Sequence, residues 1–279
     1  MTYSLGIMQG RLTPPQGRGI QFFPFDNWER EFALAAKVGL NEIEFIFDLD
    51  RYEANPLWSE SGRADIKKAI STSGVKVNHI CADFFMRRPF FRVDEATREE
   101  NVDVLKKLIE FSAQIGARTI EIPLVDNSSI KNQEEKDVLN DSLHAVLPVA
   151  DRWGVTLGLE TDLPPQPFVD LLNNANHPLV KANYDSGNSS GLGYDPDEEV
   201  VALGGYIHNI HIKDRVKGGG TVSLGMGSAD FDRLFKALKK IDYQGSFILQ
   251  TARGVESEEA ATIENHLNFV KQYIQKYLT

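Results

Sequence analysis

The sequence has one cysteine, no long apolar run and less positive than negative charge. Cys81 is the single cysteine in 279 residues, so an internal disulfide is excluded and a reducing compartment is expected. Apolar stretches are far shorter than the roughly 18 residues that a membrane-spanning helix needs. The first residues run into strand-like sequence without a basic, apolar leader segment, so we expect a soluble cytoplasmic protein.

The charge balance argues against polyanionic partners. Lysine and arginine number 30 against 40 aspartate and glutamate, which gives a formal net charge of −10. Affinity for nucleic acid or for an anionic membrane depends on clustered positive charge, so neither partner is expected. One phosphorylated small molecule is still compatible with this balance, because a few local basic side chains can hold it.

Linkers, low-complexity segments and a glycine-rich phosphate loop after the first predicted strand are all missing. The last absence removes the main support for an open nucleotide-binding sheet. The chain length and a hydrophobic content of 42% suit one large α/β domain. We therefore expect a single domain over residues 1–279.

A helical pattern that stops at a glycine, followed by a β-branched run, recurs along the chain. It occurs at Gly39, Gly74, Gly116 and Gly154, where glycine tolerates the left-handed conformation that closes a helix. The pattern predicts strands at 4–9, 42–47, 76–82, 119–125, 156–160, 180–186, 207–214 and 246–252, with helices that include 28–38, 101–115, 231–241 and 263–277. Eight alternating units favour a (β/α)₈ TIM barrel, with the segment 16–25 as a loop on its rim.

Four apolar runs in the second half each break on a side chain that can hold a metal: Glu160, Asp185, His211 and Gln250. Because side chains alternate along a strand, their apolar neighbours can face the helices while these four face the barrel axis. Two carboxylates, an imidazole and an amide oxygen suit Mn²⁺, Mg²⁺, Co²⁺ or Zn²⁺. The alternative is a set of salt bridges and strand caps, but several desolvated acids that converge without a cation would be costly.

The same two-residue alternation predicts that Glu44, His79 and Glu121 also face the barrel axis. The flanking isoleucines give Glu121 the best-defined direction of the three. Each of these residues is either a substrate contact or part of the packed interior, and the sequence leaves both alternatives open.

Five segments together resemble the xylose-isomerase-like sugar phosphate isomerase/epimerase superfamily, which includes ketose 3-epimerases, hydroxypyruvate isomerase and inosose dehydratase. The segments are LGIMQGRL at 5–12, GLE at 158–160, NYDSGN at 183–188, HIKD at 211–214 and LGMGSADF at 224–231. The resemblance spans nearly the whole chain. It implies a TIM barrel enzyme with one divalent metal ion, Mn²⁺ by preference.

The same resemblance implies that Glu160, Asp185 and His211 are metal ligands, that Glu160 is also an acid/base, and that Gln250 is the fourth ligand. Relatives commonly carry glutamate at the position of Gln250, where it serves as ligand and second acid/base. An amide can coordinate through oxygen but cannot exchange a proton near neutral pH. Relatives also often carry histidine at the position of Asn188. A metal site is therefore expected, and symmetric two-base epimerisation is in doubt.

The expected chemistry begins with removal of the proton next to a carbonyl. A divalent cation that chelates the carbonyl and the adjacent hydroxyl acidifies this C–H bond and stabilises the enediolate, and Glu160 would take the proton. Isomerisation, epimerisation and dehydration all remain open. Since Gln250 cannot donate a proton, the second donor is Glu121 by preference, or else Glu44, His79 or a metal-bound water.

The expected substrate is a small ketose or polyol, with or without a phosphate. Lys213, Arg215 and Lys217 follow the seventh predicted strand and Arg253 follows the eighth, where barrels of this type often bind anions. The alternative is a solvated basic loop that balances Asp214. The remaining candidate substrate contacts are Asn188, His79, Glu44 and, after the first strand, Arg11.

Two other functions compete with this interpretation. An abasic-site endonuclease of the same barrel type needs a multi-zinc cluster, yet only His79, His208 and His211 fall in or near strands, and the net charge opposes a duplex partner. A non-catalytic sugar-binding barrel is suggested by Gln250 and opposed by Glu160. A homo-oligomer is compatible with the sequence, which does not determine oligomeric state.

Overall fold

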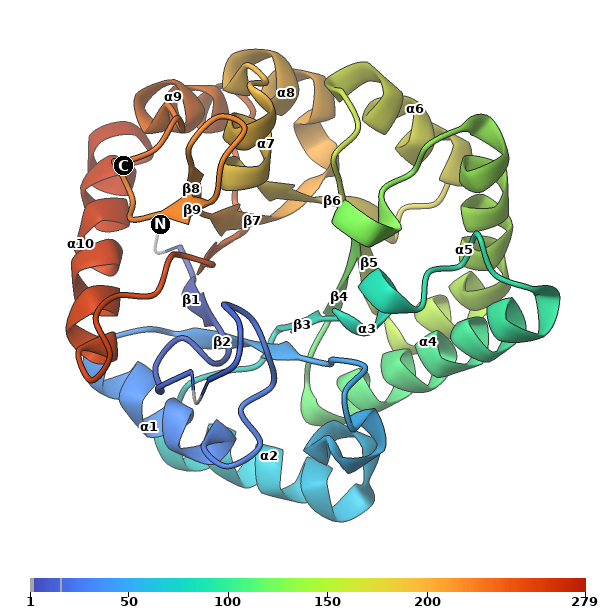
Figure 1. The fold of residues 1–279 in the computed structure, drawn as a ribbon, viewed down its shortest axis with the longest axis horizontal. Helices are drawn as coiled ribbons and strands as arrows, with labels where there is room; N and C mark the ends of the chain where they lie inside the picture. The colour runs from blue at the N-terminus through green and yellow to red at the C-terminus, as the bar shows by residue number, and fades with distance from the viewer. Residues whose placement is uncertain (1–2, 16) are drawn as a thin grey trace.

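The computed structural model describes residues 3–15 and 17–279, and its centre is a closed barrel of eight parallel strands (Figure 1). Around the barrel the strand order is β1, β10, β7, β6, β5, β4, β3 and β2. These strands are β1 (Leu5–Met8), β2 (Glu42–Ile46), β3 (His79–Cys81), β4 (Thr119–Leu124), β5 (Thr156–Thr161), β6 (Val180–Asp185), β7 (Ile207–Ile212) and β10 (Ser246–Leu249). The predicted (β/α)₈ TIM barrel is confirmed.

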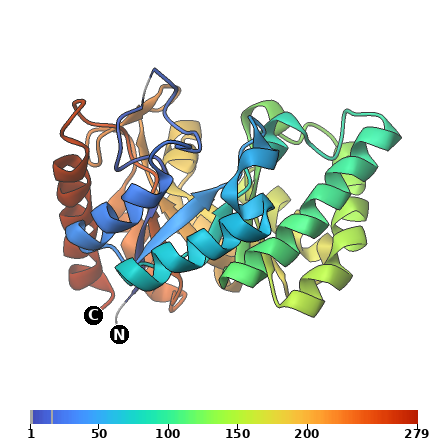
Figure 2. The same cartoon turned by 90° about the horizontal axis from the view of Figure 1, so that it is seen from below.

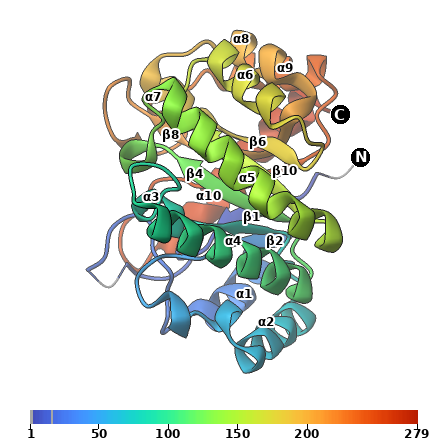
Figure 3. The ribbon, with the colours of Figure 1, turned by 90° about the vertical axis from the view of Figure 1, so that its right-hand side faces the viewer.

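A ring of helices encloses the barrel, and α4 and α5 run side by side along one flank (Figure 3). The ring consists of α1 (Trp28–Val38), α2 (Glu60–Ser73), α4 (Glu95–Ile115), α5 (Gln133–Trp153), α6 (Pro165–Ala175), α8 (Pro196–Leu203), α9 (Phe231–Lys240) and α10 (Glu259–Tyr277). Two short helices, α3 (Phe84–Arg87) and α7 (Ser186–Leu192), follow β3 and β6. No helix among the described residues combines the length and apolarity that crossing a membrane requires.

Glycines end four of these helices as predicted. Gly39, Gly74, Gly116 and Gly154 are the C-caps of α1, α2, α4 and α5, with φ between 63° and 97°. That backbone conformation is favoured only for glycine. Each glycine ends its helix a few residues before the next strand begins. The βα repeat can therefore be recognised in the sequence.

The helix predicted at 101–115 begins earlier, at Glu95, because Asp94 caps it. The Asp94 side chain accepts a hydrogen bond from the Thr97 N–H at 2.8 Å. An aspartate in this position satisfies one of the N–H groups that the first helical turn leaves free.

The strand predicted at 207–214 divides in two. β7 ends at Ile212, and β8 (Asp214–Arg215) turns away to pair antiparallel with β9 (Thr221–Val222). The Asp214 carboxylate causes this turn, since it accepts hydrogen bonds from the N–H groups of Gly225, Gly227 and Ala229. The β8–β9 hairpin thus stands beyond the carboxyl ends of the barrel strands.

The loop between β1 and α1 lies at the same end of the barrel as this hairpin, whereas β1 begins and α10 ends at the opposite end (Figure 2). Buried Glu31 of α1 holds the loop, because its carboxylate accepts hydrogen bonds from the Gly10 and Leu12 N–H groups and from the Thr13 hydroxyl. Residue 16 of the predicted rim loop lies outside the described residues.

Candidate active site

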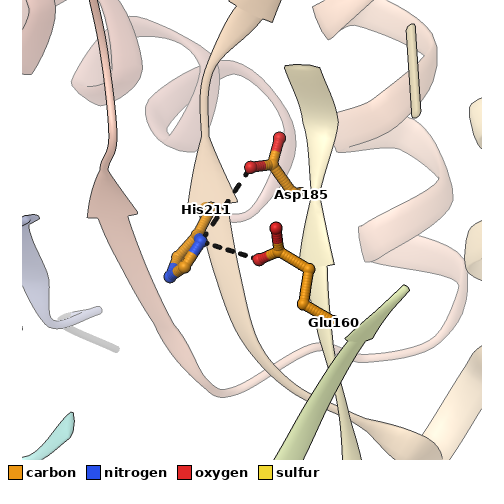
Figure 4. A group of neighbouring side chains, drawn as sticks. All are labelled: Glu160, Asp185 and His211. Atoms are coloured by element: carbon orange, nitrogen blue, oxygen red, sulfur yellow. Dashed lines mark ion pairs between the residues drawn. The ribbon is translucent and has the colours of Figure 1, made fainter. Parts of the chain in front are cut away.

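Three adjacent strands bring Glu160, Asp185 and His211 together near their carboxyl ends (Figure 4). Their ligand atoms all lie within 4.8 Å of one another, and all three side chains are buried. His211 Nδ1 lies 3.0 Å from Glu160 Oε2 and 4.0 Å from Asp185 Oδ2. We call these three residues the buried triad.

The orientation of His211 is set from the other side of its ring. Glu44 Oε2 lies 2.8 Å from His211 Nε2, and neither side chain is exposed. Burial alone would lower the pKa of His211, but the carboxylates of Glu44 and Glu160 outweigh it and raise that pKa well above its usual value. If the Nε2–H is donated to Glu44, Nδ1 is left to coordinate a cation, which is the arrangement that metal-bound histidines usually adopt.

Two asparagines hold the Glu160 carboxylate. Asn183 Nδ2 donates to Glu160 Oε2 at 2.6 Å, and Asn188 Nδ2 donates to Oε1 at 2.7 Å. Asn183 is itself held by Asn209, whose Nδ2 donates to the Asn183 Oδ1 at 2.8 Å. Both oxygens of the predicted base therefore have defined directions.

Asp185 ends β6 and also caps α7. Its Oδ1 accepts hydrogen bonds from the Gly187 and Asn188 N–H groups, each at 2.8 Å, and its Oδ2 lies 3.1 Å from Lys213 Nζ. Gly187 is required at this turn, since a Cβ atom there would lie 2.4 Å from Lys213 Cγ. The cap leaves one carboxylate oxygen of Asp185 to face cations.

Gln250 joins the group through Lys213. Lys213 Nζ lies 2.9 Å from Gln250 Oε1 and 3.2 Å from Asn188 Oδ1, in addition to its contact with Asp185. The Gln250 Nε2 donates to Gln21 Oε1 at 3.0 Å, so the amide oxygen is the atom turned towards the ammonium. The two carboxylates and the imidazole nitrogen of the buried triad form a donor set that suits a hard or borderline divalent cation. Gln250 as a fourth ligand stays a prediction.

A cavity of about 600 Å³ is lined by Glu160 of the buried triad. This volume suits a small-molecule ligand such as a sugar. Six of the predicted site residues line it: Glu121, Glu160, Asn188, Lys213, Arg215 and Gln250.

Glu121 is the most unusual residue of the cavity wall. Its side chain points inward from β4 and is buried, and neither carboxylate oxygen has a hydrogen-bond partner in the described part of the chain. Burial, and then the negative charge of Glu160, raise the pKa of Glu121 well above its usual value. This shift favours the protonated form of the carboxyl group, which is the form that can donate a proton.

Three predicted substrate contacts lie elsewhere. Glu44 is buried against His211 and is not part of the cavity wall. His79 begins β3, at the amino end of the barrel, with Nδ1 3.7 Å from Glu42 Oε2. Arg253 donates to the carbonyl oxygens of Gly10, Thr13 and Ile20 and so holds the rim loop. None of the three lines the cavity, and their role as substrate contacts stays a prediction. For Glu44 and His79 the reason is that the alternation of a strand gives the direction of a side chain but not its height along the barrel axis.

Sequence reasoning missed Gln21 and Asp83. Gln21 comes from the rim loop and links Gln250 to Asp83, with Gln21 Nε2 at 2.7 Å from Asp83 Oδ2. Burial raises the pKa of Asp83 to about 6. Its position just past β3 is the same strand-end signal that identified Asp185, whereas no sequence pattern marks Gln21 within its loop.

Comparison with known proteins gives a consistent result. The model of the xylose isomerase-like TIM barrel family matches residues 32–273. The L-ribulose-5-phosphate 3-epimerase UlaE of Escherichia coli (strain SMS-3-5 / SECEC) is 28% identical over 259 residues, which cover 89% of this chain and 90% of that protein.

Solved structures share the fold at lower identity. An L-ribulose 3-epimerase superposes with a TM-score of 0.80 at 16% identity, over 99% of this chain and 96% of that one. The IOLI protein with a binding zinc atom superposes with a TM-score of 0.76 at 21% identity, over 98% and 99% of the two chains. The expected superfamily is thereby confirmed, and the chain belongs to the xylose isomerase-like TIM barrel family.

Proposed function

We propose that this protein is a divalent-metal-dependent ketose epimerase or isomerase that works by proton abstraction next to a carbonyl group. The observation that carries the proposal is the buried triad of Glu160, Asp185 and His211, of which Glu160 lines a cavity of about 600 Å³. Family membership and an epimerase relative of 28% identity support the same reaction class.

Four residues would hold the metal: Glu160, Asp185 through Oδ2, His211 through Nδ1 and Gln250 through Oε1. When bound, the cation polarises the substrate carbonyl and the adjacent hydroxyl and stabilises the negative charge that develops on their oxygens. Mn²⁺ is our first candidate, with Mg²⁺, Co²⁺ and Zn²⁺ as alternatives; the structurally similar IOLI protein carries a zinc atom.

Glu160 would remove the proton from the carbon next to the carbonyl. The hydrogen bonds from Asn183 and Asn188 keep its carboxylate in one orientation against the cavity. A positioned general base contributes roughly 10²- to 10⁴-fold to the rate. This orientation favours proton removal from one face of the substrate.

Glu121 would deliver a proton to the opposite face. It lines the same cavity, and its raised pKa favours the protonated form. Gln250 cannot serve in this role, because an amide does not exchange protons near neutral pH. Removal by Glu160 and return by Glu121 would invert the carbon next to the carbonyl, which is epimerisation of a small ketose.

The test is metal-dependent exchange of substrate hydrogen with solvent. Protein purified without chelators is analysed for metal and then incubated in D₂O with a panel of ketoses, with deuterium followed by NMR. We expect deuterium at one carbon next to the carbonyl for at least one sugar, and none with chelated protein or with Glu160→Gln. A metal-loaded protein that exchanges no ketose in the panel would contradict the proposal.

A further inference from the structure

We infer that the cavity accepts an unphosphorylated ketose, held through its hydroxyl groups, and discriminates against a sugar phosphate. This inference rests on the proposed function and specifies the substrate class of the same site. It separates this chain from its relative that is named for a phosphorylated substrate. The grounds are the charges of the cavity wall and the partners that its cations already have.

Carboxyl groups dominate the wall of the cavity. Among the described residues the wall carries six acidic side chains and three basic ones. The bases are Arg87, Lys213 and Arg215. The acids are Asp48, Asp50, Asp83, Glu121, Asp126 and Glu160.

Two of the three bases are already paired with carboxylates. Arg87 Nη2 lies 2.5 Å from Asp50 Oδ1 at the rim, and Lys213 Nζ lies 3.1 Å from Asp185 Oδ2. Arg215 instead donates to the Gly219 carbonyl at 3.0 Å and to Asn188 Oδ1 at 3.2 Å. It is the one wall cation without a carboxylate partner in the described chain.

The other basic residues predicted for an anion site are also engaged elsewhere. Arg11 donates to the Thr251 carbonyl and to the rim loop, and Arg253 donates to three loop carbonyls. Lys217 lines a separate hollow between α7 and α9. A phosphate dianion is normally held by several cations or N–H donors together. The single Arg215 guanidinium would bind it more weakly than such a group.

Asp83 and Asp48 make their part of the cavity wall unfavourable for a further negative charge. Asp83 has its carboxylate beside Gln21 and Cys81, with no cation in contact among the described residues. Burial raises its pKa to about 6, the hydrogen bond from Gln21 moderates the rise, and the negative charge of Asp48 adds to it. A phosphate placed here would add to that repulsion. Sugar hydroxyls, in contrast, donate to such carboxylates.

The first experiment compares free and phosphorylated substrates. Metal-loaded protein is given D-allulose, L-ribulose and L-ribulose 5-phosphate, and kcat/KM is measured for each. We expect the better free sugar to exceed the phosphate ester by about tenfold or more. An equal or larger kcat/KM for L-ribulose 5-phosphate would overturn the inference.

A binding measurement separates this inference from the proposed reaction. Calorimetry compares ribitol with ribitol 5-phosphate, neither of which has a carbonyl group to react. Ribitol should bind about tenfold more tightly than its phosphate ester. Tighter binding of ribitol without turnover of any ketose would contradict the epimerase proposal and leave the substrate class standing, whereas binding of neither polyol would overturn the substrate class.

Arg215→Met tests whether the unpaired guanidinium is a phosphate anchor. We expect this variant to lower kcat/KM for free and phosphorylated sugars by the same factor. A loss at least tenfold larger for the phosphorylated sugar would assign a phosphate to Arg215 and overturn the inference. Lys217→Met is the matched control, since Lys217 lies outside the cavity, and it should change neither value.

Discussion

Glu44 and His211 form a fully buried pair, with the Glu44 Oε2 atom 2.8 Å from the His211 Nε2 atom. The two residues come from β2 and β7, which lie apart in the barrel. Their contact crosses the barrel interior and leaves Nδ1 of His211 beside Glu160 and Asp185. The pair therefore connects packing inside the barrel to the geometry of the proposed metal site.

Glu44→Gln should weaken metal binding by about 10- to 100-fold, because partners that orient a ligating histidine have effects of this size. Competition with a fluorescent chelator measures the affinity. Glu42→Gln is the matched control, since Glu42 lies on the same strand but contacts His79 and Asn78 instead. Unchanged affinity in Glu44→Gln would remove the orienting role of Glu44.

Glu121→Gln should reduce epimerisation by about 100-fold or more, which is the contribution expected of a positioned acid. Metal content should stay that of the wild type, because Glu121 is not among the proposed ligands. Solvent exchange by Glu160 should continue in this variant, since proton removal precedes proton return. A near-normal epimerisation rate would exclude Glu121 as the second-face donor.

Gln250→Glu should tighten metal binding by about tenfold, because cation affinity rises with the number of charged ligands. The added carboxylate would stand where Gln250 Oε1 now contacts Lys213 at 2.9 Å. Gln250→Leu keeps a similar volume without an oxygen and should bind metal less tightly than the wild type. Equal affinities for the three proteins would show that position 250 is not a ligand.

Lys213→Met should also tighten metal binding by about tenfold, since an ammonium 3.1 Å from Asp185 Oδ2 competes with a cation for that oxygen. Its melting temperature without metal should fall, because Asp185 then loses its buried counter-charge. Differential scanning calorimetry with and without metal measures both effects. Weaker metal binding would indicate that Lys213 positions the ligands rather than competing with the ion.

His208 should make the protein less stable in mild acid. Burial, and then the charge of His79, lower the pKa of His208 to about 4. Between this value and the ordinary 6.5 the unfolded chain binds the extra proton, so stability is lost as the pH falls from about 6.5 to about 4. His208→Gln should flatten that part of the curve in urea unfolding, and His144→Gln, on the exposed face of α5, should not.

The amino-acid sequence by itself determined the barrel and the identity of the buried triad. Helix-ending glycines such as Gly39 and Gly116 and the alternation around Glu160 are local features, since each depends on the φ of one residue or on the two-residue period of a strand. Helix ends and the inward faces of strands can therefore be predicted without knowing which distant segments are in contact. The same reasoning placed Glu121 on the inner face of β4.

Only the tertiary structure decided how high each inward side chain lies and what it contacts. Glu44 and His79 both point inward, yet one supports His211 and the other lies at the amino end of the barrel beside Glu42. Arg253 and Gln21 depend on how the rim loop folds back. The physical reason is that barrel stagger and loop closure arise from packing between distant segments, which a two-residue period does not encode.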